Sequence, residues 1–424
     1  MRFILLILGL DVLGIGLAIP VMPTLIATIW PSSAEHVSLA LGVALTLYSA
    51  MQFLCAPLLG ALSDCHGRRP ILLLALAGMC LGNLMAGFAG SLTVLLIGRA
   101  IAGITAANIA TAMAYIADIS EGEQRTHFYG AAGSVIAIAL VFGPVIGGGL
   151  ASYGPHLPFL VAGGLAAINL LYGYMRLPES LAAEHRRAFE WRRTNPFGSL
   201  RGLWSTQGLR PYLLAATCSW FAYGIFQSCF VLANQMRYGW SMLEVSYALA
   251  ALALGMAFAQ RVLVRKLTPI MSNQRIIVTG YACCLLGYGF YTAAASVWLT
   301  VVGMCFHAVG LIAEPALRSE LSRHARAGHQ GELQGGLTSL LSLVGGLAPV
   351  IGALIFAGNL GSGQHVLWLG APFVVSLLMY VLAIGCIQRG EHQRPATVDP
   401  RAGNPSASAE YHTQRIARIV QLHQ

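Results

Sequence analysis

Charged side chains are scarce in this chain. Of its 424 residues only 10% are Asp, Glu, Lys or Arg, whereas 56% are hydrophobic. A soluble domain has about 25% charged residues, and a solvated surface cannot be built from so few. We therefore expect most of the surface to face lipid, which excludes a soluble globular protein.

Motifs of catalysis and metal binding are also missing. The nine Cys residues nearly all fall in apolar stretches, with no CxxC pair and no His/Cys spacing of a metal site. We find neither a nucleophile motif nor a His/Asp/Glu cluster with metal spacing, so an integral membrane enzyme is disfavoured. No metal and no organic cofactor is implied. The first apolar stretch has no small-residue cleavage site after it, so we expect a retained span rather than a signal peptide.

Long apolar stretches recur along the whole chain. A membrane-spanning helix needs about 20 mainly apolar residues. The 48 Gly residues suit such helices, because small side chains let two backbones approach closely. The sequence predicts an all-α integral membrane protein with twelve spans, at residues 3–28, 38–61, 71–90, 92–117, 127–151, 157–177, 211–235, 242–264, 275–295, 297–318, 333–357 and 365–387.

Basic residues lie almost entirely on one side of these spans. An even number of spans places both termini on one side, and 23 of the 25 Lys and Arg residues fall there. The exceptions are Arg237 on the far side and Arg99 inside a span. By the positive-inside rule the basic side is cytoplasmic. The net charge of +9 then reflects topology and contact with anionic lipid, and no nucleic-acid partner is implied.

The connection 178–210 is the longest between two spans and divides the chain. We expect a six-helix half at 1–177, a cytoplasmic loop at 178–210, a second six-helix half at 211–387 and a disordered cytoplasmic tail at 388–424. A weak repeat relates the halves: Gly-Pro-Val-Ile-Gly ending at Gly147 recurs as Ala-Pro-Val-Ile-Gly ending at Gly352, 205 residues later. Gly130 and Gly335 have the same offset.

The turn after the second span reads Gly-Ala-Leu-Ser-Asp-Cys-His-Gly-Arg-Arg-Pro over residues 60–70. It could be a merely solvated basic turn. Its spacing resembles the loop signature of the major facilitator superfamily, with Cys65 in place of the first Arg. The resemblance implies two parallel halves that rock about a midplane substrate site. It also implies that the exchange between facing states depends on Gly60, Asp64, Gly67, Arg68 and Arg69. We expect Asp64 to stabilise one facing state through a helix N-terminus, that of the eleventh span near Gly331.

Two charged residues lie inside the predicted spans of the first half. Asp11 is about 12 Å deep at 1.5 Å per residue, and Arg99 stands in the fourth span. Charges at such positions are costly and usually functional. Asp11 and the following Gly and Pro residues resemble the first span of the tetracycline-type drug/proton antiporters, and Arg99 resembles their buried fourth-helix Arg. We expect a titrating pair that couples transport to protons; a static structural pair is the alternative.

The fifth span resembles the antiporter signature of the same family, with Ala139 in place of its middle Gly. In the family this signature marks exporters more than importers. Gly and Pro residues bend a span and allow close helix contact. Further stretches, at 48–52, 116–118, 237–240 and 330–335, resemble the tetracycline exporter group. The signature residues here are Gly130, Gly143, Pro144, Gly147 and Gly148.

The chain departs from that group at three positions. Tetracycline exporters carry an acid in the third span, a His in the eighth and an acid in the ninth, where this chain has Gly82, Met256 and Cys284. Export of tetracycline as a metal chelate is therefore not expected. Conversely, Glu314 lies in the tenth span with His307 two turns earlier on roughly the same face. Glu314 is a candidate for proton coupling or substrate binding, unless it lies near the cytoplasmic end and is solvated.

Aromatic and amide side chains in several spans are candidates to line a cavity. An apolar cavity with few polar groups suits an amphipathic ligand, although each residue alone could equally serve helix packing. The candidates are Tyr48, Gln52, Asn108, Trp220, Tyr223, Gln227, His307 and Glu314.

These features together predict a proton-driven exporter of small amphipathic compounds. We expect it in the bacterial inner membrane, working as a monomer by alternating access between its two halves. A metabolite/proton importer on the same fold remains an alternative. A sensor that does not transport is another, although the short tail offers no signalling domain.

The predicted topology can be tested with a fusion after Gln388. Because the basic residues gather on one side, a reporter that is active only in the periplasm should be silent when fused there. Strong reporter activity in whole cells would overturn the number of spans. A fusion in the predicted far-side connection near Arg237 should be active and serves as the control.

Overall fold

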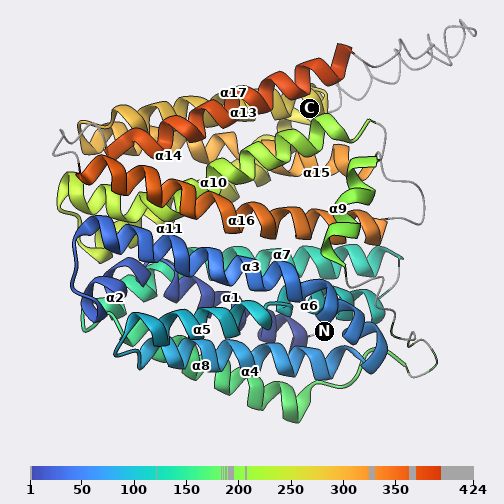
Figure 1. The fold of residues 1–424 in the computed structure, drawn as a ribbon. Coiled ribbons are helices and arrows are strands. Elements are labelled where there is room, and N and C mark those ends of the chain that lie inside the picture. The colour runs from blue at the N-terminus through green and yellow to red at the C-terminus, as the bar shows by residue number, and fades with distance from the viewer. Residues whose placement is uncertain are drawn as a thin grey trace, which may run out of the picture.

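The computed structural model describes residues 2–120, 122–182, 184, 186, 189, 195–205, 208–323, 330–361 and 369–392. Over these residues the chain forms helices and connecting turns, with no strand. Most helices run side by side along one direction, and the start of the first and the end of the last lie at the same end of the bundle (Figure 1). We call this the termini end and the opposite one the distal end. The predicted tail beyond residue 392 lies outside the described residues.

The first half of the chain contributes eight helices. The third helix ends at His66 and is followed by Gly67, whose φ of +105° is readily adopted only by glycine. They are α1 (Arg2–Ala18), α2 (Met22–Ile29), α3 (Ala34–His66), α4 (Arg68–Gly87), α5 (Leu92–Ile104), α6 (Asn108–Asp118), α7 (Gly122–Ala151) and α8 (Leu157–Arg176).

The central segment and the second half contribute the remaining helices. One of them, η3, is a π-helical turn that continues α11 into α12. They are α9 (Pro196–Ser205) in the central segment, then α10 (Arg210–Tyr238), α11 (Met242–Phe258), η3 (Ala259–Leu263), α12 (Val264–Leu267), α13 (Asn273–Ala293), α14 (Val297–Gly310), α15 (Ala313–Arg323), α16 (Gln330–Gly361) and α17 (Ala371–His392).

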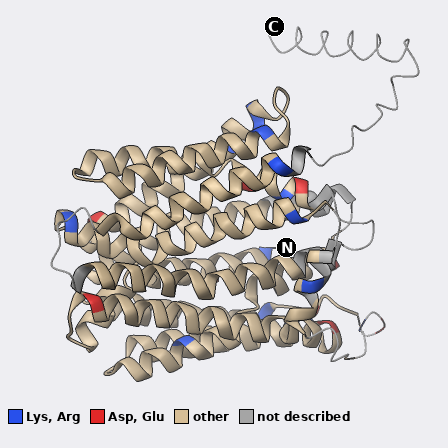
Figure 2. Cartoon of the chain, turned by 45° about the horizontal axis from the view of Figure 1, so that its top comes forward, with Lys and Arg blue, Asp and Glu red and all other residues tan. Residues whose placement is uncertain are grey.

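The described helices account for the predicted spans. Eleven of them are long and apolar enough to cross a membrane, and the pair α1–α2, bent by 52°, makes a twelfth if it is one span. The all-α fold with twelve spans is thus confirmed. Basic side chains gather at the termini end (Figure 2), whereas Arg237 stands in the last turn of α10 at the distal end.

Besides the bent pair α1–α2, two of the described spans are broken near their middle, which the sequence analysis did not predict. The fourth span stops at Ile104 and resumes as α6 at Asn108, and the tenth stops at Gly310 and resumes as α15 at Ala313. Residues 108 and 313 are 205 positions apart, the offset of the repeat found in the sequence. The two halves therefore repeat a local backbone feature as well as a glycine pattern.

Close helix packing follows the same repeat. A Cβ atom at Gly82 on α4 would lie 2.7 Å from the carbonyl oxygen of Gly98 on α5. A Cβ at Gly287 on α13 would lie 2.8 Å from the carbonyl oxygen of Gly303 on α14. Each pair brings two backbones together where any side chain would separate them, and the members of the two pairs are again 205 residues apart.

The two halves pack against each other at the distal end. Helix α3 lies along α16, and α7 lies along α11. The Ser38 hydroxyl donates to the Ala353 carbonyl oxygen at 3.5 Å, and Thr46 donates to the carbonyl of Gly346. At the termini end, the central-segment helix α9 packs on α16, and its Phe197 ring lies 5.3 Å from the Phe53 ring of α3.

The α3–α16 contact predicts a steric effect at Gly42. A Cβ there would lie 2.8 Å from that of Ala353, so Gly42→Val should lower the thermal unfolding midpoint through an overpacking cost of about 1–3 kcal/mol. The purified protein in detergent gives the measurement. Gly164→Val on α8, where a Cβ meets no atom within 4 Å, is the control. An equal effect of both variants would contradict the packing argument.

Candidate functional site

The carboxyl group of Asp11 is buried at the break in the fourth span. The residue is 4% exposed, and its Oδ1 accepts a hydrogen bond of 2.7 Å from Nδ2 of Asn108. Asn108 is the first residue of α6, and the preceding N-cap residue, Ala107, supplies no side-chain cap. The N-terminus of a helix favours a negative charge. The Oδ2 atom of Asp11 has no hydrogen-bond partner among the described residues.

Arg99 is buried on α5 with a different partner. Its Nη2 donates to Oδ1 of Asn83 at 3.2 Å, and the residue is 7% exposed. Among the described residues, the ion pairs do not include one between Arg99 and Asp11. The direct pair expected from the sequence is therefore wrong for this conformation. Tyr48 on α3 lies within electrostatic range of both charged groups.

The break itself is supported from α3. Gln52 donates from Nε2 to the carbonyl oxygen of Ala106 at 3.4 Å, and the backbone of Tyr48 lies against Gly103. Since backbone groups at a break lack helical partners, this amide satisfies one of them. Gln52 thus contacts the polar break rather than lining the cavity described below.

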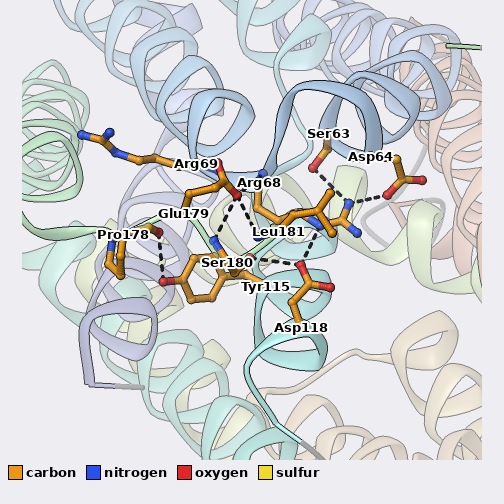
Figure 3. Close-up of polar contacts among 10 residues, drawn as sticks. All are labelled: Ser63, Asp64, Arg68, Arg69, Tyr115, Asp118, Pro178, Glu179, Ser180 and Leu181. Carbon is orange, nitrogen blue, oxygen red and sulfur yellow. Dashed lines mark hydrogen bonds and ion pairs between the residues drawn. The ribbon is translucent and has the colours of Figure 1, made fainter. Parts of the chain in front are cut away.

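The turn after the second span forms an ion-pair network centred on Arg68 (Figure 3). One guanidinium nitrogen, Nη1, contacts Oδ1 of Asp64 at 2.5 Å, and Nε contacts Oδ2 of Asp118 at 3.0 Å. Asp118 ends α6, so the network joins the second, third and fourth spans. We expected Asp64 to contact the eleventh span near Gly331. The side-chain environment of Gly331 lies outside the described residues, so this prediction stays untested. A Cβ at Gly60 would meet no atom within 4 Å.

A residue that the sequence analysis overlooked completes this network. The Glu179 carboxylate accepts hydrogen bonds from the backbone N–H groups of Arg68 at 2.8 Å and Arg69 at 3.2 Å. It caps the first turn of α4, where Gly67 provides no side chain, and a Cβ at position 67 would collide with it. Arg69 in turn donates to the Tyr174 carbonyl at 2.7 Å. The turn is thus fastened to the end of the sixth span.

The glycines of the fifth span bring α7 against two other helices. A Cβ at Gly16 on α1 would lie 2.9 Å from Cα of Gly143, and one at Gly147 would collide with the backbone of Leu17. One at Gly148 would collide with Ser246 on α11 of the other half. Pro144 stands inside α7, and the surroundings of Gly130 lie outside the described residues. The signature therefore fixes α7 between α1 and α11.

A cavity of about 160 Å³ lies between the halves. Helices α1, α2, α3, α7, α10 and α11 and the turn between α1 and α2 form its wall. Of the predicted lining residues, Tyr223 and Gln227 face it, whereas Tyr48, Gln52, Asn108, Trp220, His307 and Glu314 are not among its lining. The lining is Gly16, Ile19, Pro20, Pro23, Leu41, Leu45, Leu140, Pro144, Tyr223, Phe226, Gln227, Phe230, Val231, Leu249, Leu252, Ala253 and Met256.

His307 and Glu314 do not share a helix face as expected. The tenth span breaks between them, so two-turn spacing along one helix does not apply. His307 is fully buried among aromatic rings, and its Nδ1 lies 3.3 Å from the Tyr291 hydroxyl. Glu314 stands in the first turn of α15 and accepts from Nε of Arg318 at 2.8 Å.

Removing the charge of Glu179 should loosen the turn. In Glu179→Gln a neutral amide oxygen replaces the charged acceptor of the Arg68 and Arg69 backbone N–H groups, which lowers the contribution of each hydrogen bond by about 1 kcal/mol. The midpoint of thermal unfolding in detergent should fall, and transport should slow. Glu184→Gln, at an exposed residue of the same segment, is the matched control. If both variants unfold like the parent, Glu179 does not stabilise the start of α4.

Comparison with known proteins places this architecture in a family. The model described as Major Facilitator Superfamily matches residues 4–349. The Tetracycline resistance protein, class C, of Escherichia coli is 36% identical over 388 residues, covering 91% of this chain and 95% of the relative. The class D protein of Salmonella ordonez is 33% identical over 377 residues, covering 88% and 93%.

Solved structures share the fold. A bacterial homolog of the human lysosomal transporter Spinster, crystallised inward-facing and unoccupied, has a TM-score of 0.75 at 16% identity over 92% of this chain and 96% of that one. The human organic anion transporter MFSD10 has a TM-score of 0.70 at 23% identity over 91% and 98%. The chain belongs to the Major Facilitator Superfamily and, within it, to the group of the tetracycline resistance proteins.

Proposed function

We propose that this protein exports small amphipathic compounds across the bacterial inner membrane in exchange for protons. The observation that carries this proposal is the buried carboxyl group of Asp11. It lies at mid-span with Asn108 as its partner, and an intramembrane carboxyl group of this kind is suited to exchanging protons. The relatives named for tetracycline resistance support export rather than import.

The direction of the helices follows from the charge distribution. Since Lys and Arg gather at the termini end (Figure 2), the positive-inside rule puts that end, both termini and the central segment in the cytoplasm. The halves, residues 1–177 and 211–387, then pack together on the periplasmic side. This is the arrangement of a transporter closed to the outside, which one monomer suffices to form.

Helix α1 links the proton site to the cavity. It carries Asp11, and Gly16 a little over one turn later lines the cavity. The backbone contact between Gly16 and Gly143 transmits any tilt of α1 to α7. Protonation of Asp11 at Oδ2 removes its charge from the N-terminus of α6 and so changes the balance between facing states. Arg99, held by Asn83, supplies the opposite charge that the second facing state uses.

Two further groups would act outside the Asp11 site. The network of Asp64, Arg68 and Asp118 would hold the termini-end turns in one facing state and release them in the other. Glu314 is paired with Arg318 on α15, so it would contribute to proton coupling only after that pair separates. Asp11 is therefore the primary coupling group and Glu314 the second candidate.

The names of the relatives make tetracycline a candidate substrate, and the structure of this chain argues against its metal chelate. At position 82 a Cβ would lie 2.7 Å from the Gly98 carbonyl oxygen, so an acid there is sterically excluded. Cys284 is 1% exposed, and only Met256 of the three divergent positions lines the cavity. Among the described residues no group of His, Cys, Asp and Glu could hold a metal ion.

The direction of accumulation distinguishes export from the alternative, import. Energised inverted vesicles that contain an exporter accumulate its substrate as protons leave the lumen, whereas those that contain a proton symporter do not. The proton dependence is tested by collapsing the gradient with an uncoupler. Accumulation of the substrate in intact cells or right-side-out vesicles, but not in inverted vesicles, would favour the importer.

Asp11→Asn should abolish uphill accumulation while substrate binding remains measurable. The amide keeps the shape of the side chain and its place beside Asn108 but cannot exchange a proton. Substrate-induced proton release in detergent, measured beside uptake by inverted vesicles, checks this. Glu35→Gln at the distal end of α3 is the control and should behave like the parent. If Asp11→Asn still releases protons and still transports uphill, Glu314 becomes the leading coupling group.

A further inference from the structure

No described side chain in the lining of the cavity between the halves is charged at neutral pH. None of its 17 lining residues is Asp, Glu, Lys, Arg or His, and the side chains that offer hydrogen bonds are Tyr223 and Gln227. A charged ligand would lose its hydration on entry and find no opposite charge in the wall. Burying an unpaired charge is far more costly than burying a polar group that finds a hydrogen bond. The lining therefore selects against ions of either sign.

One wall of the cavity is aromatic and firmly supported. The Tyr223 and Phe226 rings are stacked, with centroids 6.2 Å apart and planes 18° apart, and Phe230 follows at 4.5 Å from Phe226. Behind this wall, the rings of Tyr291 and His307 lie 5.7 Å and 5.0 Å from Phe226. Aromatic pairs with these separations attract each other beyond simple burial. Phe226 is 3% exposed and has little freedom to rotate, so it supports the Tyr223 ring, which is 38% exposed and presents the flat surface.

The polar groups of the cavity stand together on α10. Tyr223 and Gln227, one helical turn apart, are the exposed residues in a stretch from 222 to 230 that is otherwise buried. An amide has one acceptor oxygen and two donor hydrogens, so Gln227 has the capacity to bind one donor or acceptor of a ligand beside the aromatic wall.

We propose that this cavity binds uncharged, flat aromatic compounds that carry one hydrogen-bonding group. The ring of the ligand lies against Tyr223, which Phe226 supports from behind, and its polar group meets Gln227. The inference rests on the proposed export function and narrows its substrate class. Asp11 is not part of the lining, so protons and substrate bind at separate places. Exchange of an uncharged compound for a proton moves net charge, so the membrane potential as well as the pH gradient drives it.

Four naphthalene derivatives test the charge and the ring requirement separately. They are uncharged 2-naphthol, anionic 2-naphthoate, the permanent cation trimethyl(2-naphthyl)ammonium, and decahydro-2-naphthol, in which the flat ring is saturated. Binding to the purified full chain in detergent is measured by calorimetry at neutral pH. We expect 2-naphthol to bind at least about tenfold more tightly than either ion, and more tightly than its saturated analogue.

Two substitutions should each change which of the four ligands the cavity binds most tightly. Gln227→Glu places a negative charge in the cavity, so affinity for trimethyl(2-naphthyl)ammonium should rise about tenfold or more while that for 2-naphthoate falls. Tyr223→Leu removes the flat surface, so the advantage of 2-naphthol over decahydro-2-naphthol should disappear. Leu254→Phe on the exposed face of α11 is the control and should leave all four affinities unchanged.

The outcomes separate this inference from the export proposal. If the unmodified protein binds the cation as tightly as 2-naphthol, or if Gln227→Glu leaves the preference unchanged, the cavity does not select by charge and the inference is overturned. If 2-naphthol does not bind, yet inverted vesicles accumulate another compound with protons as the driving ion, the inference fails and export stands. If 2-naphthol binds but no vesicle accumulates it, export of this class fails and the binding site stands.

Discussion

The hydrogen bond between Asn108 and Asp11 is the contact on which the site depends. A carboxyl group in the middle of a bilayer is costly unless a nearby group compensates it. Here the compensation comes from the start of a helix that begins in mid-span, together with an amide at its first residue. The break in the fourth span is therefore a requirement of the buried acid. A continuous helix would offer only backbone groups already bonded within it.

The same helix break occurs in both halves of the chain. In the described residues, the break of the first half contacts a buried acid from another span, whereas that of the second half does not. In the second half the resumed helix α15 has Glu314 in its own first turn, paired with Arg318 one turn later. The repeat thus conserves backbone geometry while the side chains differ. In the proposed mechanism, this asymmetry lets two halves of one architecture have different roles: the first holds the proton site and the second contributes the aromatic wall of the cavity.

The sequence predicted the spans well because hydropathy and length suffice to define them. It failed where tertiary contacts decide the outcome. The Asp11–Arg99 pair was inferred from depths along straight helices, whereas the broken span puts Asn108 beside Asp11 and Asn83 beside Arg99. No proline marks that break. Glu179 was missed because it lies 111 residues from Arg68 and its role depends on the turn at Gly67. Tyr223 and Gln227 were anticipated from their chemistry, and His307 was misplaced because an aromatic cluster encloses it.

In the proposed mechanism, coupling between proton and substrate depends on backbone packing rather than on a shared side chain. Helix α1 carries both Asp11 and Gly16, a residue of the cavity wall. The backbone of Gly16 contacts Gly143 of α7 without intervening side chains. Gly148 of α7 in turn contacts α11 across the interface between the halves. A rigid contact of this kind transmits small rotations, because close-packed interiors deform little. A charge change at Asp11 thus reaches the interface through two helices, and the cavity, which lies on that path, can remain free of charge.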